Sequence, residues 1–423
     1  MDKPLKILLI LVHSTQNAGD LALLKVSIYQ LRKIFKNPSF TISANYPDEI
    51  WYEENSYKVV SSPISLIGKS KNIPSGVQFI KFILSLIITL MFFMKIRFFI
   101  PKKWDLLLSE YESSDVVVAV PGNQIFSTGR LGWPFPVSIF CIILAHLFRK
   151  PFYVLPQSIG PFRRWWEKIL IRYAYSKAKL IFLRDQVSME IAQQIGLPKD
   201  KVVFAPDPAI ALEQSKKETA REFLYKYGWN PEKPSLGVTI IAPMGRFLNT
   251  RELENYYLVL ASTLVRICSK WDLQVVFFIQ VSGPTEVEND RIPTSLIYSK
   301  IHPQIKAIFI DEVLTPEMLK ACYGEMDMFL ASRLHSGIFS ISMGVPTVFI
   351  GYLTKTVGFL KAIGLDKYGL TLNDLYEKDI LLKVLDEVWL SRNEISLSLR
   401  KLTKNLLYEI DVIFNSIYSS LKK

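Results

Sequence analysis

Cysteine and histidine are scarce in this chain of 423 residues, and their positions exclude several kinds of site. The three cysteines, Cys141, Cys268 and Cys322, are odd in number, far apart and embedded in apolar runs. This spacing excludes a disulfide framework and a Cys-x-x-Cys metal site, and it is typical of a reducing compartment. No set of His, Cys, Asp and Glu residues has metal-ligand spacing, and the Gly-x-Ser-x-Gly elbow of serine hydrolases does not occur. No metal is therefore expected.

Basic residues are in excess, but they are not concentrated in any stripe. The chain has 51 Lys and Arg against 39 Asp and Glu, a net charge of +12. Recognition of nucleic acid needs a cluster of basic residues, and only short pairs such as Arg163-Arg164 occur here. We therefore expect no nucleic-acid partner, because attraction to anionic lipid or to phosphorylated substrates explains the sign equally well.

The amino-terminal run MDKPLKILLILV has a short apolar stretch, and no small-residue cleavage site follows it. A buried first strand explains this run better than a signal peptide does. We therefore predict a cytoplasmic protein.

One long hydrophobic segment, residues 77–100, breaks the pattern of the rest of the chain. Its uncharged part, Phe82–Met94, lies between Lys81 and Lys95 and is shorter than the roughly 20 apolar residues of a spanning helix. A single span would also place the strands before and after it on opposite sides of a bilayer. Two interpretations stay open: a helix in the membrane interface with its basic side chains reaching outward, or a core or dimer-interface helix.

Short β-branched runs alternate with helix-length amphipathic segments, which predicts parallel sheets covered on both faces. The predicted strands are Lys6–Val12, Asp115–Val120, Pro151–Leu155, Lys179–Leu183, Lys201–Ala205, Ser235–Ile241, Leu273–Val281, Ile305–Ile310, Asp327–Ala331 and Pro346–Ile350. The rhythm pauses at residues 213–234, which we interpret as a linker. The sequence thus predicts an α/β protein with domains at 1–212 and 235–370, followed by helices over 371–423 that could return to the first domain.

Polar and glycine-bearing groups follow most of these strands, at the sheet edge where α/β proteins bind ligands. They are Asn17-Ala18-Gly19-Asp20, Pro121-Gly122-Asn123, Gln157-Ser158-Ile159-Gly160-Pro161, Arg184-Asp185, Asp207-Pro208 and Arg333-Leu334-His335-Ser336-Gly337. Asp20 and Asp207 have an equally good interpretation as helix caps. His335 is the leading catalytic candidate, because it opens a helix beside Arg333 and can exchange a proton near neutral pH. Gly337 would allow the backbone to approach closely.

Taken in order, these segments resemble the polysaccharide pyruvyl transferase family. The resemblance rests on the motifs above, with Ser188, Gly196, Gly344-Val345-Pro346, Tyr352-x-x-Lys355 and Gly358, and it covers about Lys6 to Gly364. It implies a GT-B-like fold, two Rossmann-like parallel-sheet domains facing across a cleft. It also implies transfer of the pyruvyl group of phosphoenolpyruvate onto two hydroxyls of one sugar as a ketal, with release of phosphate and no cofactor.

The resemblance also suggests roles for particular residues. His335 would be the acid and Arg333 a second catalytic group. Donor contacts are expected from Arg184, Arg333, Leu334, Ser336, Lys355 and Arg246, and acceptor contacts from Asn17, Asp20, Asn123 and Gln157. A glycine pair is common in the family where this chain has Gly122-Asn123, which leaves the acceptor open.

The expected partners are phosphoenolpyruvate and a glycan or lipid-linked oligosaccharide, and an oligomer is compatible with the sequence. Two other functions remain as alternatives: a nucleotide-sugar glycosyltransferase on the same scaffold, and a non-catalytic subunit of a polysaccharide-assembly complex. The first would be favoured by an acidic residue after Pro346 that holds a ribose, and none occurs between Gly351 and Lys361.

Overall fold

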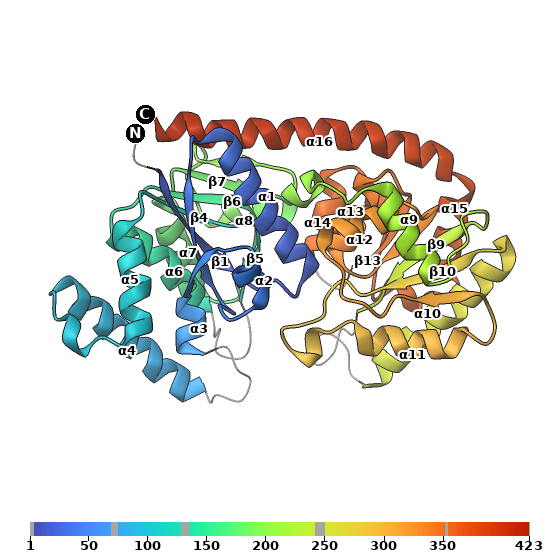
Figure 1. The fold of residues 1–423 in the computed structure, drawn as a ribbon, viewed down its shortest axis with the longest axis horizontal. Helices are drawn as coiled ribbons and strands as arrows, with labels where there is room; N and C mark the ends of the chain where they lie inside the picture. Colours follow the sequence, from blue (N-terminus) through green and yellow to red (C-terminus); the bar gives the residue numbers. More distant parts are fainter. Residues whose placement is uncertain (1–3, 69–74, 128–134, 242–249, 352–353, 423) are drawn as a thin grey trace. The chain divides into compact units, whose positions relative to one another are not determined.

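The computed structural model describes residues 4–68, 75–127, 135–241, 250–351 and 354–422. These residues form two compact units (Figure 1). Unit 1 comprises residues 1–15, 23–208 and 410–423, and unit 2 comprises residues 16–22 and 209–409. The short segment 16–22 therefore belongs to unit 2, although the rest of the amino-terminal region belongs to unit 1.

Unit 1 is built on a parallel sheet in which strands follow the order β3-β2-β1-β4-β6-β7-β8, with β5 paired to β6. The strands are β1 (Lys6–Val12), β2 (Ser39–Ala44), β3 (Lys58–Ser61), β4 (Val116–Ala119), β5 (Gly122–Ile125), β6 (Phe152–Ile159), β7 (Leu180–Leu183) and β8 (Val202–Phe204). Its helices are α2 (Ile50–Glu54), α3 (Pro63–Ile67), α4 (Ser75–Phe93), α5 (Lys102–Ser113), α6 (Phe135–Leu147), α7 (Trp165–Ser176) and α8 (Gln186–Gln194), and α1 (Ala18–Ile34) begins in unit 2 and continues in unit 1. Helices α3, α5 and α6 contact strands of this sheet, and α4 forms an outer layer on α3 and α5 (Figure 1).

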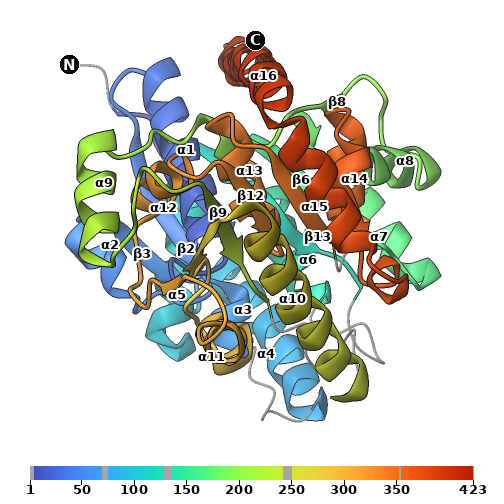
Figure 2. The same ribbon diagram turned by 90° about the vertical axis from the view of Figure 1, so that its right-hand side faces the viewer.

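Unit 2 contains a second parallel sheet, with the order β11-β10-β9-β12-β13-β14. Its strands are β9 (Ser235–Thr239), β10 (Gln274–Phe278), β11 (Ala307–Phe309), β12 (Met328–Ala331), β13 (Thr347–Gly351) and β14 (Gly369–Thr371). Its helices are α9 (Lys217–Lys226), α10 (Thr250–Trp271), α11 (Arg291–Ile301), α12 (Pro316–Tyr323), α13 (Leu334–Ser342), α14 (Thr354–Ala362) and α15 (Ile380–Leu390), and α16 (Arg392–Leu421) begins in this unit and ends in unit 1. Helices α10 and α11 pack together, and α12 packs on α13 (Figure 2).

The predicted strands are all present, but four others were not predicted: β2, β3, β5 and β14. Strand β5 has the sequence GNQI, whose glycine and amides are typical of a loop. Ser61 ends β3, and the Ser62 hydroxyl caps α3 by accepting a hydrogen bond from the Ser65 N–H at 3.1 Å.

Lys320 is an unusual buried cation in α12 of unit 2. Its ammonium group donates hydrogen bonds to the backbone oxygens of Ile210 (2.8 Å) and Leu212 (2.7 Å). Burial lowers the pKa of Lys320 from 10.5 to about 8. The side chain thus links α12 to residues 210–212 of the same unit. Below pH 8 the ammonium group is charged, and its desolvation lowers the stability of the folded state.

This buried amine predicts a specific pH dependence of stability. Because the pKa is lower in the folded state, the unfolded state binds more protons between about pH 8 and about pH 10.5, so stability rises with pH in this window and is lost as pH falls through 8. The free energy of unfolding of the wild type, relative to that of Lys320→Met, should therefore rise by about 2–3 kcal/mol from pH 8 to about pH 10. Urea unfolding at several pH values measures this difference, and a constant difference would show that Lys320 does not titrate in that range.

Candidate functional site

The amino end of α13 lies where strands β9 and β12 of unit 2 end. Thr239, the last residue of β9, shares a hydrogen bond of 2.7 Å with the Ser336 hydroxyl. The Ser336 hydroxyl also lies 2.8 Å from the backbone oxygen of Arg333, the residue that precedes the helix. The first N–H groups of a helix have no intrahelical acceptor and carry partial positive charge, so this turn is suited to an anionic group.

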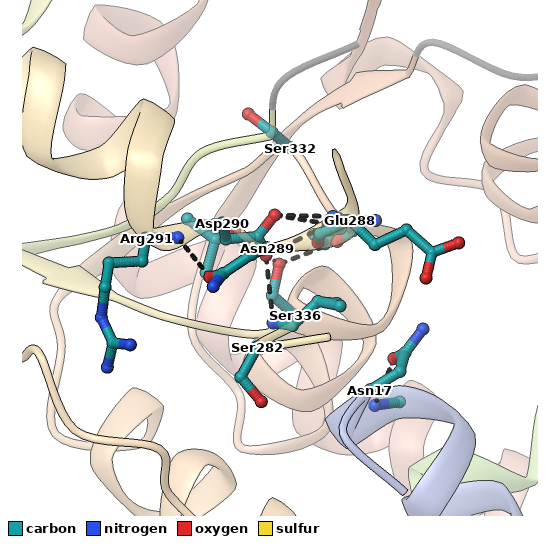
Figure 3. A network of polar contacts seen from close by, with 12 residues as sticks. Asn17, Ser282, Glu288, Asn289, Asp290, Arg291, Ser332 and Ser336 are labelled. Atoms are coloured by element: carbon teal, nitrogen blue, oxygen red, sulfur yellow. Dashed lines mark hydrogen bonds and ion pairs between the residues drawn. The ribbon is translucent and has the colours of Figure 1, made fainter. Parts of the chain in front are cut away.

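Arg333 is held by a buried aspartate that the sequence analysis did not single out. Its Nε and Nη2 donate to the Asp290 carboxylate at distances of 2.6–3.2 Å, and Nη2 also donates to the Glu288 backbone oxygen at 2.9 Å. Figure 3 shows Asp290, Glu288 and Ser336 within this network. Burial raises the pKa of Asp290, and the neighbouring Arg333 guanidinium opposes that rise.

The Arg333 pairing changes what this residue can offer to a ligand. A bidentate arginine was expected to grip the donor, but its Nε and Nη2 are directed to Asp290 and Glu288. The carboxylate of Asp290 also opposes the positive charge of the guanidinium. The contacts therefore indicate that Arg333 fixes the loop before α11 against the start of α13, and its contact with a donor stays a prediction.

His335 lies against the first turn of α1, which belongs to the same unit. A methyl group built on Gly19 would lie 2.2 Å from His335 Nδ1, so only glycine permits this approach. Asn17, the residue before α1, forms a β-bridge with Val281, and the Ala18 N–H donates to the Gln280 backbone oxygen at 3.2 Å. His335 is 9% exposed, and it is enclosed by α13 and the start of α1, two elements that are more than 300 residues apart in the chain.

Asn17 and Asp20 have distinct places in this turn. The Asn17 side-chain oxygen accepts hydrogen bonds from the N–H groups of Gly19 (3.0 Å) and Asp20 (3.3 Å), so Asn17 caps α1. Asp20 is half-buried in the first turn of the helix. The alternative that Asp20 is the cap is therefore wrong, and acceptor binding by either residue stays a prediction.

Two other residues of the α13 turn serve packing. Leu334 is buried. A methyl group on Gly337 would lie 1.9 Å from the Phe349 ring of β13. The close approach expected at Gly337 is thus made by a core side chain.

In unit 1, Arg184 and its neighbours form a buried network after strands β6 and β7. Arg184 is 1% exposed, its Nη1 lies 2.6 Å from Asp207 Oδ2, and its Nε donates to the Ser158 hydroxyl at 3.1 Å. Asp185 caps α8 by accepting from the Ser188 N–H at 2.8 Å, and the Ser188 hydroxyl accepts from the Ile159 N–H at 2.9 Å. These contacts give the motif residues a structural role in unit 1, whereas Arg333 and His335 lie in unit 2.

The remaining predicted site residues have different surroundings in the structure. Gln157 is buried, donates to the Val120 backbone oxygen at 2.8 Å and accepts from the Tyr175 hydroxyl at 2.5 Å, so its side chain serves the core of unit 1. Asn123 is half-buried on β5, and its amide oxygen has no hydrogen-bond partner among the described residues. Arg246 lies outside the described residues, and Lys355 is known only as part of α14. Among the residues that the structure describes, no three His, Cys, Asp or Glu side chains are grouped to hold a metal ion.

Known proteins that are similar to this chain identify its family. The model of the polysaccharide pyruvyl transferase family matches residues 17–354, so the chain belongs to this family. The amylovoran biosynthesis protein AmsJ of Erwinia amylovora is 23% identical over 394 residues, with 90% of this chain and 91% of the relative covered. The family makes the protein a transferase of polysaccharide biosynthesis, in agreement with the sequence resemblance.

Solved structures support the fold. A glycosyltransferase from Rickettsia africae matches with a TM-score of 0.60 and 12% identity, covering 100% of both chains. A UDP-GlcNAc 2-epimerase from Methanocaldococcus jannaschii matches with a TM-score of 0.56 and 14% identity, covering 96% of this chain and 100% of that chain. The predicted α/β class of GT-B type is confirmed, and these two neighbours have different activities on one fold.

Proposed function

We propose that this protein moves the pyruvyl group of phosphoenolpyruvate onto a sugar of a cell-surface or exopolysaccharide, or of its lipid-linked precursor, as a ketal. Membership of the family supports transfer of a pyruvyl group to a polysaccharide. The observation that carries the donor and its place is the enclosure of His335 between the first turns of α13 and α1, beside the Arg333–Asp290 pair. This arrangement offers a proton donor next to a helix amino end, which suits a substrate with a phosphate and a carboxylate.

The proposed reaction takes place in two additions to one carbon. Protonation of the methylene carbon of phosphoenolpyruvate by His335 gives an oxocarbenium-like centre, and a sugar hydroxyl adds there and returns its proton to the histidine. The phosphate then leaves with the proton of a second hydroxyl, which adds to the same carbon. The methyl group gains one proton, phosphate gains the other, and both come from the two hydroxyls, so the reaction needs no oxidant.

The donor's charges require several partners in this scheme. The first-turn N–H groups of α13 with the Ser336 hydroxyl would meet the phosphate or carboxylate, and Lys355 and Arg246 would add positive charge. Arg333 acts as a positioning residue, because Asp290 and the Glu288 oxygen hold two of its nitrogens. Arg184 is assigned to the framework of unit 1, where it pairs with Asp207.

The residues suited to the acceptor are Asn123, Asn17 and Asp20. Asn123 has a buried amide oxygen without a partner among the described residues, and that oxygen would accept a hydrogen bond from a sugar hydroxyl. Asn17 and Asp20 flank Gly19, the residue that His335 contacts, at the start of α1. The three cysteines are free and buried, which supports a cytoplasmic location.

Calorimetric titration with phosphoenolpyruvate, and separately with a panel of nucleoside-diphosphate sugars, tests this function. The variant Gly19→Ala forces the His335 ring to move and should weaken binding of phosphoenolpyruvate at least about tenfold, a loss of roughly 1.4 kcal/mol. Gly76→Ala is the matched control, because Gly76 is also the second residue of its helix and a methyl group there meets nothing within 4 Å. Binding of a nucleotide sugar without binding of phosphoenolpyruvate would favour the glycosyltransferase alternative.

A further inference from the structure

The buried and exposed side chains of helix α4 do not follow the pattern of a helix on a water-exposed surface. The side chains that it buries against unit 1 include the polar residues Gln78, Ser85 and Thr89. Most of the large apolar side chains point outward, whereas Phe92 is buried: Val77, Phe79, Ile80, Ile83, Leu84, Leu86, Ile87, Leu90 and Phe93 are all exposed. A helix in water normally places such residues against the core, so this face is suited to an apolar medium.

The outward apolar face is too wide for a single helix partner. At 3.6 residues per turn, the exposed apolar residues from Val77 to Met94 cover an arc of about 200°. A seam between two helices uses a much narrower stripe. The exposed apolar surface continues past the helix through Met94, Ile96, Phe98 and Phe99, with Phe98 91% exposed.

The helix lies along unit 1 rather than projecting from it. Near its start, the Gln78 amide donates to the Gly68 backbone oxygen at 3.3 Å, and the Phe82 ring lies 5.7 Å from that of Phe140. Near its end, Phe92 lies 5.7 Å from Phe148. Strands β3 and β4, which precede and follow α4, belong to one parallel sheet. These contacts exclude a crossing of the bilayer and leave a helix that lies flat on the unit.

The chain segment that contains this helix carries charge of one sign. Residues 55–104 contain no Asp or Glu, and their basic residues are Lys58, Lys69, Lys71, Lys81, Lys95, Arg97, Lys102 and Lys103. Lys81, Lys95, Lys102 and Lys103 are exposed beside the apolar residues. Arg97 pairs with Asp105 (3.8 Å) and Glu112 (2.9 Å) of α5, so the four exposed lysines carry the excess positive charge beside the face. A wide apolar face with exposed lysines beside it is complementary to a bilayer whose surface carries anionic lipid.

We propose that the α4 face, the exposed apolar residues of 77–99 with these four lysines, docks in the interface of an anionic lipid bilayer. The apolar side chains enter the boundary between headgroups and acyl chains, and the lysines contact anionic headgroups. This docking does not depend on the proposed reaction. If that reaction holds, docking would bring the enzyme to the surface where a lipid-linked acceptor resides.

Sedimentation with vesicles tests the proposal on the full chain. The wild type should bind vesicles of phosphatidylcholine with one quarter phosphatidylglycerol, and bind vesicles of phosphatidylcholine alone much more weakly. The triple variant Ile80→Gln, Leu84→Gln, Ile87→Gln should bind at least about a hundredfold more weakly, because each removed apolar contact contributes roughly fivefold or more. All three side chains are exposed, so the fold should persist.

Two further variants separate the contributions. Lys102→Gln with Lys103→Gln should weaken binding to the anionic vesicles about 30-fold, roughly fivefold for each lysine near the surface. The matched control Leu258→Gln, Ile292→Gln, Leu296→Gln removes equally exposed apolar side chains from α10 and α11 and should bind as the wild type does. Equal binding by the wild type and the α4 triple variant would overturn the proposal. So would a lipid-independent dimer that fails to bind vesicles and becomes monomeric in that variant.

Discussion

Replacement of His335 by glutamine should lower turnover by about 10²–10⁴-fold, the range that a general acid contributes. Glutamine keeps a polar side chain beside Gly19 but cannot deliver a proton near neutral pH. Phosphate released from phosphoenolpyruvate in the presence of the glycan acceptor measures the turnover. The pH profile of the variant should also lack the limb that the imidazole contributes to the wild-type profile. If the histidine were purely structural, the two profiles would have the same shape.

His302→Gln is the matched control for this variant. His302 also lies in unit 2, but it is exposed at the end of α11, where its ring stacks on Tyr298 with centroids 5.2 Å apart. The control should keep wild-type turnover. Unchanged turnover and pH profile in His335→Gln would remove the histidine from the chemistry.

The second large effect concerns stability, and it comes from the Arg184–Asp207 pair in unit 1. Arg184→Met should destabilise the protein by about 3–5 kcal/mol, because it leaves the fully buried Asp207 carboxylate without its cation. Replacing both partners, Arg184→Met with Asp207→Leu, should recover part of the loss, since no buried charge then remains unpaired. Urea unfolding followed by circular dichroism measures both changes.

An exposed ion pair of the same unit provides the comparison. Lys33 and Asp411 lie 3.0 Å apart, with side chains 52% and 43% exposed. Lys33→Met should cost at most about 1 kcal/mol, since water and salt screen such a pair. If Arg184→Met costs no more than Lys33→Met, the Arg184 network is not what holds the ends of β6 and β7.

The fold could be predicted from sequence because parallel strands buried on both faces have a strong local signature. Runs such as KILLILV at Lys6–Val12 carry this signature, and the structure places β1 over the same residues. Strand β5, with the sequence GNQI, has none of it, because its pairing with β6 comes from the chain around it. Short polar strands of this kind are stabilised by their neighbours rather than by their own residues.

The site could be predicted only as a set of local motifs. The turn Arg333-Leu334-His335 was identifiable because it follows a buried strand and opens a helix. Its partners were not, because Asp290 is 43 residues from Arg333 and no local pattern marks it. The contact between Gly19 and His335 depends on the assignment of residues 16–22 to unit 2, which no feature of the sequence reveals.

The central claim is that phosphoenolpyruvate binds at the start of α13 in unit 2, and hydrogen–deuterium exchange on the full chain tests it most directly. First-turn amides of a helix exchange readily unless a ligand accepts their hydrogen bonds. Addition of phosphoenolpyruvate should slow exchange in peptides that cover residues 333–337, and the slowing should diminish in Gly19→Ala. Protection confined to residues 157–161 and 184–188 of unit 1, with none at 333–337, would contradict the account.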